Sequence, residues 1–211
     1  MKAAEPPKAR VMESARLKAI GPPFVALFVL AIALPQPWWS VTLSSPSDEI
    51  SFEFGLRSMC ISSPPVCIEY APLASADSDY IPLRNVFAGV LALLAAALAL
   101  TLGSFLLGLR RGRSPYALLG SIICALGGGL AVVAALAYLL LGLPSAYQAA
   151  AGPPFANVVT GFFGSTSAEG TSVTYRGAIG WWLCLVAAFF LWTGVMLGFL
   201  ETRTARKAGG D

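Results

Sequence analysis

The chain has 211 residues, of which 56% are hydrophobic and 12% are charged, and its mean hydropathy is +0.72. Soluble domains carry about 25% charged residues, so this composition excludes a disordered chain and argues against a water-soluble globule. The absence of histidine removes Ser-His and Cys-His catalysis, histidine metal sites and histidine pH switches. The net charge of +3 is small and scattered, so we expect no nucleic-acid partner.

Four stretches are long and apolar enough for the roughly 20 residues that a membrane-spanning helix needs. They predict an all-α membrane fold, a bundle of four transmembrane helices at residues 19–39, 82–109, 116–143 and 178–200. The remaining segments are two tails, a short loop and two longer loops: 1–18, 201–211, 110–115, 40–81 and 144–177. The first stretch also has the basic leader and short apolar centre of a signal peptide, and this alternative stays open.

Basic residues are concentrated in three flanks of these spans. The two tails and the loop with Arg110, Arg111 and Arg113 hold eleven of the fourteen Lys and Arg residues. With four spans these flanks share one side, which the positive-inside rule makes cytoplasmic. We therefore expect a multi-pass plasma-membrane protein with both termini in the cytoplasm and the three arginines as a cytoplasmic anchor.

The first outer loop alternates apolar and polar residues in three places: Trp39–Leu43, Ile50–Leu56 and Val66–Tyr70. Alternation with a period of two predicts strands with one buried face, and Ser44–Asp48 is typical of a turn. These patterns predict a small antiparallel extracellular β-sheet. Residues 173–175 alternate in the same way and would add one edge strand from the second outer loop.

Four cysteines divide between the predicted loops and helices. Cys60 and Cys67 lie in the first outer loop, and the oxidising outer side of the membrane favours a disulfide between them. Two free thiols are the alternative. Cys124 and Cys184 fall inside helices, where cysteine is usually a small apolar packing residue. We expect no metal and no cofactor.

The second outer loop contains an apolar tract that ends in the pair Phe162 and Phe163. Exposed aromatic residues there would contact a partner protein or rest in the lipid headgroup layer, and both interpretations stay open.

The cores of the last three predicted helices contain no ionisable residue, although such residues mark proton relays and substrate paths in membranes. We therefore expect a non-enzymatic protein whose helices pack through small residues, such as Gly120 with Cys124 and the run Gly127–Gly129.

The whole pattern resembles the claudin and peripheral-myelin-protein superfamily. The resemblance covers residues 24–200 and rests on a few positions: Trp38, Trp39, Gly55, Leu56, Cys60, Cys67, Tyr70 and Arg84. Arg57 stands where the family has a tryptophan after Gly-Leu. The resemblance implies four spans, an outer sheet and a role in contacts between membrane proteins.

We therefore expect a claudin-like membrane protein that acts through its outer sheet in adhesion, lateral assembly or membrane organisation. Its partners would be the lipid bilayer and other membrane proteins of the same or another kind. One alternative is an accessory subunit of an ion channel or other larger membrane complex. A second is a charge-selective paracellular barrier or pore, with Glu69, Asp77 and Asp79 on its surface, although these acids also suit a simple solvated face.

Overall fold

The structure is a computed structural model that describes residues 7–110, 115–151, 158–168 and 170–208. The chain divides into two compact units, which are described separately here. The helical unit consists of residues 1–29, 96–131 and 186–211, and the sheet unit consists of residues 30–95 and 132–185.

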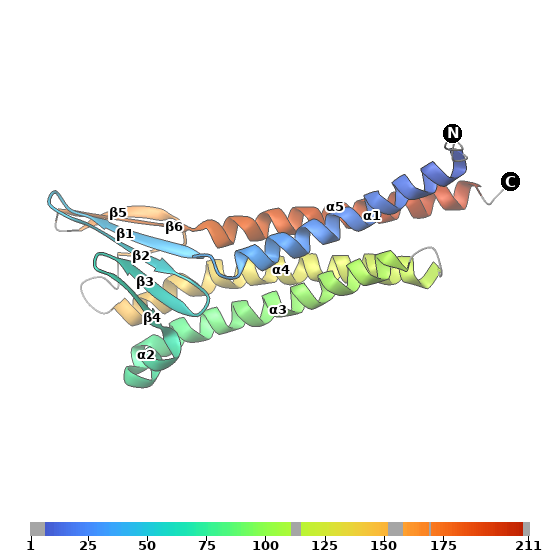
Figure 1. The fold of residues 1–211 in the computed structure, drawn as a ribbon. Helices are drawn as coiled ribbons and strands as arrows, with labels where there is room; N and C mark the ends of the chain where they lie inside the picture. The colour runs from blue at the N-terminus through green and yellow to red at the C-terminus, as the bar shows by residue number, and fades with distance from the viewer. Residues whose placement is uncertain (1–6, 111–114, 152–157, 169, 209–211) are drawn as a thin grey trace. The chain divides into compact units, whose positions relative to one another are not determined.

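Most of the described chain is helical, and its strands lie in the sheet unit (Figure 1). The helices are α1 (Pro7–Ala33), α2 (Tyr70–Ala76), α3 (Ile81–Leu109), α4 (Pro115–Ala151) and α5 (Ile179–Ala208), with a 3-10 turn η1 (Ser78–Tyr80). The strands are β1 (Trp39–Ser44), β2 (Glu49–Phe54), β3 (Ser58–Ser62), β4 (Pro65–Glu69), β5 (Gly164–Ala168) and β6 (Thr171–Gly177).

Three helical stretches of the described chain are long and apolar enough to cross a membrane: Ser78–Leu109, Tyr116–Ala151 and Ile179–Leu200. The chain is therefore a membrane protein by helix length and composition. The apolar part of α1, Ile20–Ala33, is shorter than these three stretches.

The helices differ from the predicted spans by more than one residue at four ends. Helix α1 begins at Pro7 and α5 continues to Ala208, so both extend into the segments that were expected as tails. The first span was expected to reach Trp39, but α1 ends at Ala33, because Pro35 and Pro37 follow and Trp39 already pairs in β1. The second outer loop was expected to begin at Pro144, but α4 continues through it to Ala151. The residues after Pro144 are mostly alanines and other helix-compatible residues, which lets the helix continue beyond the proline.

In the helical unit, segments of α1, α3, α4 and α5 pack side by side through small residues. Gly127 and Gly128 face Leu100 and Thr101 of α3, whereas Gly129 faces Trp192 of α5. This confirms that the glycine run serves close packing toward more than one helix. On this unit the start of α1, the ends of α3 and α5 and the start of α4 lie at the same end (Figure 1).

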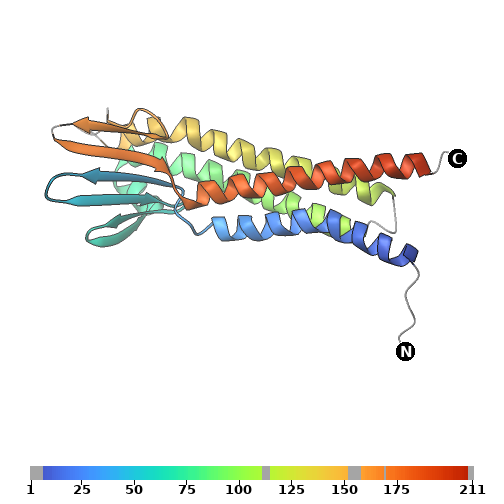
Figure 2. The ribbon, with the colours of Figure 1, turned by 90° about the horizontal axis from the view of Figure 1, so that it is seen from above.

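The strands of the sheet unit form one antiparallel sheet in the order β4-β3-β2-β1-β6-β5 (Figure 2). The predicted antiparallel sheet is thus confirmed, but it is larger than expected. The residues around Val173 were expected at an edge, yet β6 lies between β1 and β5. The hairpin turn after β1 is confirmed, because Ser45 N donates to Asp48 O at 2.8 Å.

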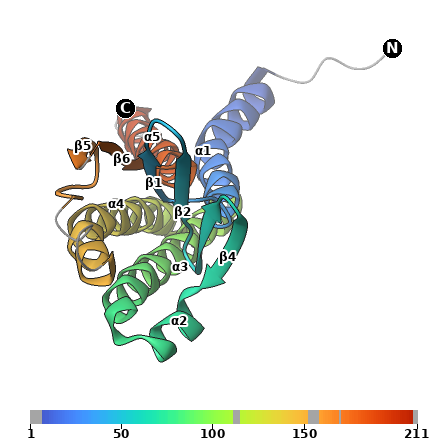
Figure 3. The ribbon, with the colours of Figure 1, turned by 90° about the vertical axis from the view of Figure 1, so that its left-hand side faces the viewer.

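The sheet has one apolar and one polar face because its strands alternate in register. Val41 lies between Phe52 of β2 and Tyr175 of β6, and Trp39 lies between Phe54 and Gly177. These side chains face the helical ends of the same unit and are largely buried. Beyond β4 the chain turns through α2 before it enters α3 (Figure 3).

Candidate functional site

Trp38 joins three segments of the sheet unit. Its indole Nε1 donates to the carbonyl of Ala33 at the end of α1, at 3.1 Å. Its backbone N donates to Phe54 O at 2.7 Å, and its carbonyl accepts from Ala178 N at 3.0 Å. The side chain is fully buried. Trp38 therefore fixes where the end of α1, strand β2 and the start of α5 meet.

Trp39 lies at the centre of an aromatic cluster under the sheet. Its Nε1 donates to Phe162 O at 2.9 Å, and its ring lies 5.1 Å from Phe54 and 5.3 Å from Tyr147. Phe162 is 4% exposed, so it belongs to this interior, whereas Phe163 is 45% exposed. Of the pair expected at the surface, Phe163 is the member available to lipid or a partner.

Gly55, Leu56 and Tyr70 meet where β2 turns into β3. The Tyr70 hydroxyl donates to Gly55 O at 3.1 Å, and Tyr70 N donates to Arg57 O at 3.0 Å. The Tyr70 ring stacks on Phe87 of α3 at 5.0 Å. Burial raises the pKa of the Tyr70 phenol above its ordinary value. Tyr70 therefore fastens the start of α2 to both the sheet and α3, while Leu56 is buried beside it.

The arginines singled out in the sequence lie apart from these contacts. Arg84 is exposed on the first turn of α3 and donates to Asn85 Oδ1 at 3.3 Å. Arg110 is exposed at the end of α3 in the helical unit. Arg111 and Arg113 fall outside the described residues.

The polar face of the sheet is the candidate functional surface. Paired residues from five strands form one row across it, in the order Arg176, Ser40, Glu53, Cys60 and Cys67. The next row includes Thr174, Thr42 and Ser51. Together these eight residues are called the polar face. The polar face presents hydroxyls, one carboxylate and one guanidinium. Groups on neighbouring strands are separated by the regular spacing between strands, about 5 Å.

A disulfide joins Cys60 and Cys67 on the polar face, as predicted. It links β3 to β4, which pair directly at these two residues. The bridge therefore holds the edge strand β4 on the sheet at the point where the polar face ends.

Glu69, Asp77 and Asp79 lie around α2, and all three side chains are exposed. Glu69 and Asp77 flank the helix at its two ends, and Asp77 Oδ1 accepts from Asp79 N at 3.0 Å. Glu69 is the last residue of β4, two residues after Cys67 of the row that contains Glu53, whereas Asp77 and Asp79 follow α2.

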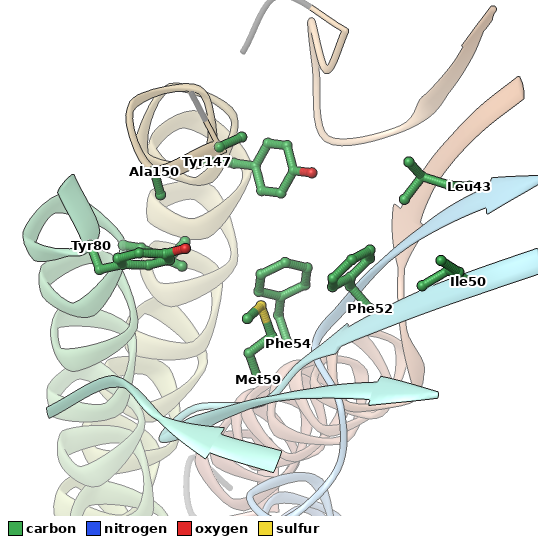
Figure 4. A pocket seen from close by; sticks show the side chains of 10 residues that line it. Leu43, Ile50, Phe52, Phe54, Met59, Tyr80, Tyr147 and Ala150 are labelled. Atoms are coloured by element: carbon green, nitrogen blue, oxygen red, sulfur yellow. The ribbon is translucent and has the colours of Figure 1, made fainter. Parts of the chain in front are cut away.

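Sequence patterns missed a cavity of about 370 Å³ in the sheet unit (Figure 4). Strands β1, β2 and β3 line one side of it, and η1, α3 and α4 line the other. Phe52 and Phe54 come from β2, and Tyr80 and Tyr147 come from the helical side. Alternation in β2 marks these strand residues as buried, but only the fold shows that helices leave a space beside them.

A comparison with protein-family models and with curated protein sequences finds no match to this chain.

Proposed function

We propose that the chain is a non-enzymatic, claudin-like membrane protein with four spans that acts through its sheet in adhesion, lateral assembly or membrane organisation. The observation that carries the proposal is the polar face, a continuous surface built by strands from two separate loops. Sheets stiffened by a disulfide and tied to helices present such a surface with little conformational freedom to lose on binding.

In the part of the chain that the structure describes, β4 and β5 are the two edge strands of the sheet, with no further strand paired on their outer sides. Edge strands of this kind pair with strands of other chains. Pro65 has no backbone N–H to donate along β4, which makes β5, with its sequence Gly-Ser-Thr-Ser-Ala, the more suitable edge for such pairing.

The proposal includes α1 as the fourth span, both termini in the cytoplasm and the sheet outside the plasma membrane. Within the helical unit, Phe24 of α1 packs on Phe105 of α3 at 5.7 Å, and Pro23 lies beside Gly194 of α5. These contacts support a place for α1 among the spans. Epitope tags at the two termini should become accessible to antibody only after the cells are permeabilised; access in intact cells would contradict this orientation.

Site-specific photo-crosslinking tests the proposed contacts. A benzophenone amino acid at Thr174, on the polar face, should give adducts in native membranes, and the same group at Leu141, exposed on α4, serves as the lipid-facing control. Adducts that add another 22.0 kDa would support self-association, whereas a larger constant increment would favour the accessory-subunit alternative. A monomer without adducts at Thr174 would contradict both.

A second candidate, a charge-selective barrier, is favoured by the three exposed acids around α2. No basic residue lies between Glu69 and Arg84, so this segment carries a net negative charge. Such a surface would favour cations along a path between cells. In cell layers that express the protein, Glu69→Lys should lower the cation preference of the paracellular conductance; an unchanged preference would remove this candidate.

A further inference from the structure

The cavity of the sheet unit is lined by apolar groups on both sides. Leu43, Ile50 and Phe52 project into it from β1 and β2, and Tyr147 and Ala150 face them from α4 (Figure 4). Among the residues that the structure describes, the lining contains no carboxylate, ammonium or guanidinium group. An occupant must therefore be uncharged over the part that enters the cavity, because an unpaired charge there would be desolvated without compensation.

The size and chemistry of the cavity disfavour water as its filling. A volume of about 370 Å³ lies within the range of about 300–1,000 Å³ typical of small-molecule sites. Ordered water needs two to four polar partners, and among the described residues the side chains of the lining offer the hydroxyls of Tyr80 and Tyr147. The space is open to solvent on one side, so the water in it contacts mostly apolar groups. A hydrocarbon group that displaces this water removes apolar surface from contact with water, which is favourable.

The cavity adjoins the ends of two helices that are able to span a membrane. Leu83 belongs to the apolar stretch Ser78–Leu109, and Tyr147 and Ala150 belong to Tyr116–Ala151. Both stretches are longer than the roughly 20 residues that cross the hydrocarbon layer, so their ends extend into the headgroup region. Tyrosines are enriched at this depth, where the hydroxyl meets polar groups and the ring meets hydrocarbon.

We propose that this cavity binds the hydrocarbon chain of a membrane phospholipid, whose head group stays at the cavity mouth near the two tyrosine hydroxyls. Phospholipids supply hydrocarbon chains at high concentration beside the membrane-spanning helices. The proposal requires only the membrane character of the chain and is independent of the contacts proposed for the polar face.

Photolabelling of the full-length protein in phosphatidylcholine vesicles tests this site. The probe is a phosphatidylcholine with a diazirine at the end of one acyl chain. Adducts on lipid-facing helix residues such as Leu141 and Phe189 are expected in any case. Occupation of the cavity adds adducts on β2 and β3, at Phe52, Phe54 or Met59. Adducts confined to the helices would overturn the proposal.

A variant whose cavity is filled by a larger side chain is compared with a variant that carries the same side chain outside the cavity. Ala150 lines the cavity, whereas its neighbour Ala149 is exposed. Ala150→Trp should reduce the β2 and β3 adducts roughly tenfold, because an indole in the cavity leaves no room for the chain. Ala149→Trp should leave them unchanged, and adducts on the helices should persist in both variants.

The remaining outcomes also decide the question. Equal labelling of β2 and β3 in Ala150→Trp and the wild type would show that the probe reaches the strands by another route and would overturn the proposal. A benzophenone amino acid placed at Phe52 provides a second test: protein–protein adducts in place of lipid adducts would assign the cavity to a second copy of the chain and overturn the proposal too. If Ala150→Trp does not fold, Ala150→Leu makes the same comparison and should give a smaller reduction.

Discussion

The indole of Trp38 lies directly over the backbone of Gly180. A Cβ atom at position 180 would lie 2.7 Å from Trp38 Nε1 and 2.9 Å from its Cδ1. Gly180 N also donates to Pro37 O at 2.8 Å, so the helix start and the loop before β1 are held at this distance. The absence of a side chain at Gly180 is what allows α5 to begin against Trp38.

Gly180→Ala should therefore destabilise the sheet unit by about 1–3 kcal/mol, because the rigid indole or the start of α5 must move. Thermal unfolding in detergent, followed by tryptophan fluorescence, measures the effect. Gly161→Ala is the control in the same unit, because its Cβ would meet only Phe163 O at an ordinary 3.7 Å. Equal stability of the two variants would contradict the close contact.

Loss of the disulfide should loosen one edge of the sheet. The bridge closes a short loop, so the Cys60→Ser, Cys67→Ser double variant should lose about 2–3 kcal/mol in the chain-entropy account. Hydrogen exchange should rise in β3 and β4, while β1 and β6, which pair in the interior of the sheet, keep their protection. Uniformly faster exchange across all strands would instead mean that the bridge supports the entire sheet.

Tyr70→Phe should reveal the hydrogen bond to Gly55 through its pH dependence. At neutral pH the variant should be less stable by about 0.5–1.5 kcal/mol, since Gly55 O loses its donor. The pKa of the buried phenol is raised, so the wild type holds this advantage fully below about pH 10, where the unfolded chain ionises. The advantage should shrink as the pH rises above 10.

Unfolding in detergent at several pH values between 7 and 11 measures this difference. All other ionisable groups are common to both proteins and cancel in the comparison. A stability gap that stays constant up to pH 11 would contradict the predicted coupling between the Tyr70 proton and the folded state.

Ser104 and Ser121 should couple α3 to α4 within the helical unit. The two hydroxyl oxygens lie 3.2 Å apart, each also lies 2.9 Å from the other residue's carbonyl, and Ser104 is buried. A double-mutant cycle with alanine should give a coupling of about 0.6 kcal/mol, with about 1.7 kcal/mol as the upper range for such bonds in membranes. Thr193 is the control, because its hydroxyl bonds to Phe189 O within α5 and should show no coupling to Ser104.

The alternation of apolar and polar residues was sufficient to predict the strands whose two faces differ most in polarity. Trp39–Leu43 and Ile50–Phe54 alternate because one side is packed on helices, and this difference is visible in the residues themselves. The disulfide also followed from two cysteines on a loop at an oxidising surface. These strands and this disulfide could be predicted because the residue types that produce them stand close together in the sequence.

Two other strands depend on pairing with strands next to them in the chain, because their own residues show no clear alternation. Gly164–Ala168 is composed of small and polar residues typical of a loop, and it becomes β5 because each residue pairs with β6. Ser58–Ser62 becomes β3 through its pairing with β2 and β4. Strand formation here reflects pairing with a neighbouring strand more than intrinsic preference. The cavity was missed for a different reason, since its lining comes from six separate elements, some of them far apart in sequence.

The connections of the sheet have a mechanical consequence. β1 follows α1 through a short loop, β4 runs without a break into α2 and on toward α3, and β6 leads into α5 after Ala178. Three short connections thus tie the sheet to helices, spread from one edge to its far half, and a fourth, longer connection of residues 152–163 joins α4 to β5. A pull on any one strand is therefore shared among several helices through the backbone.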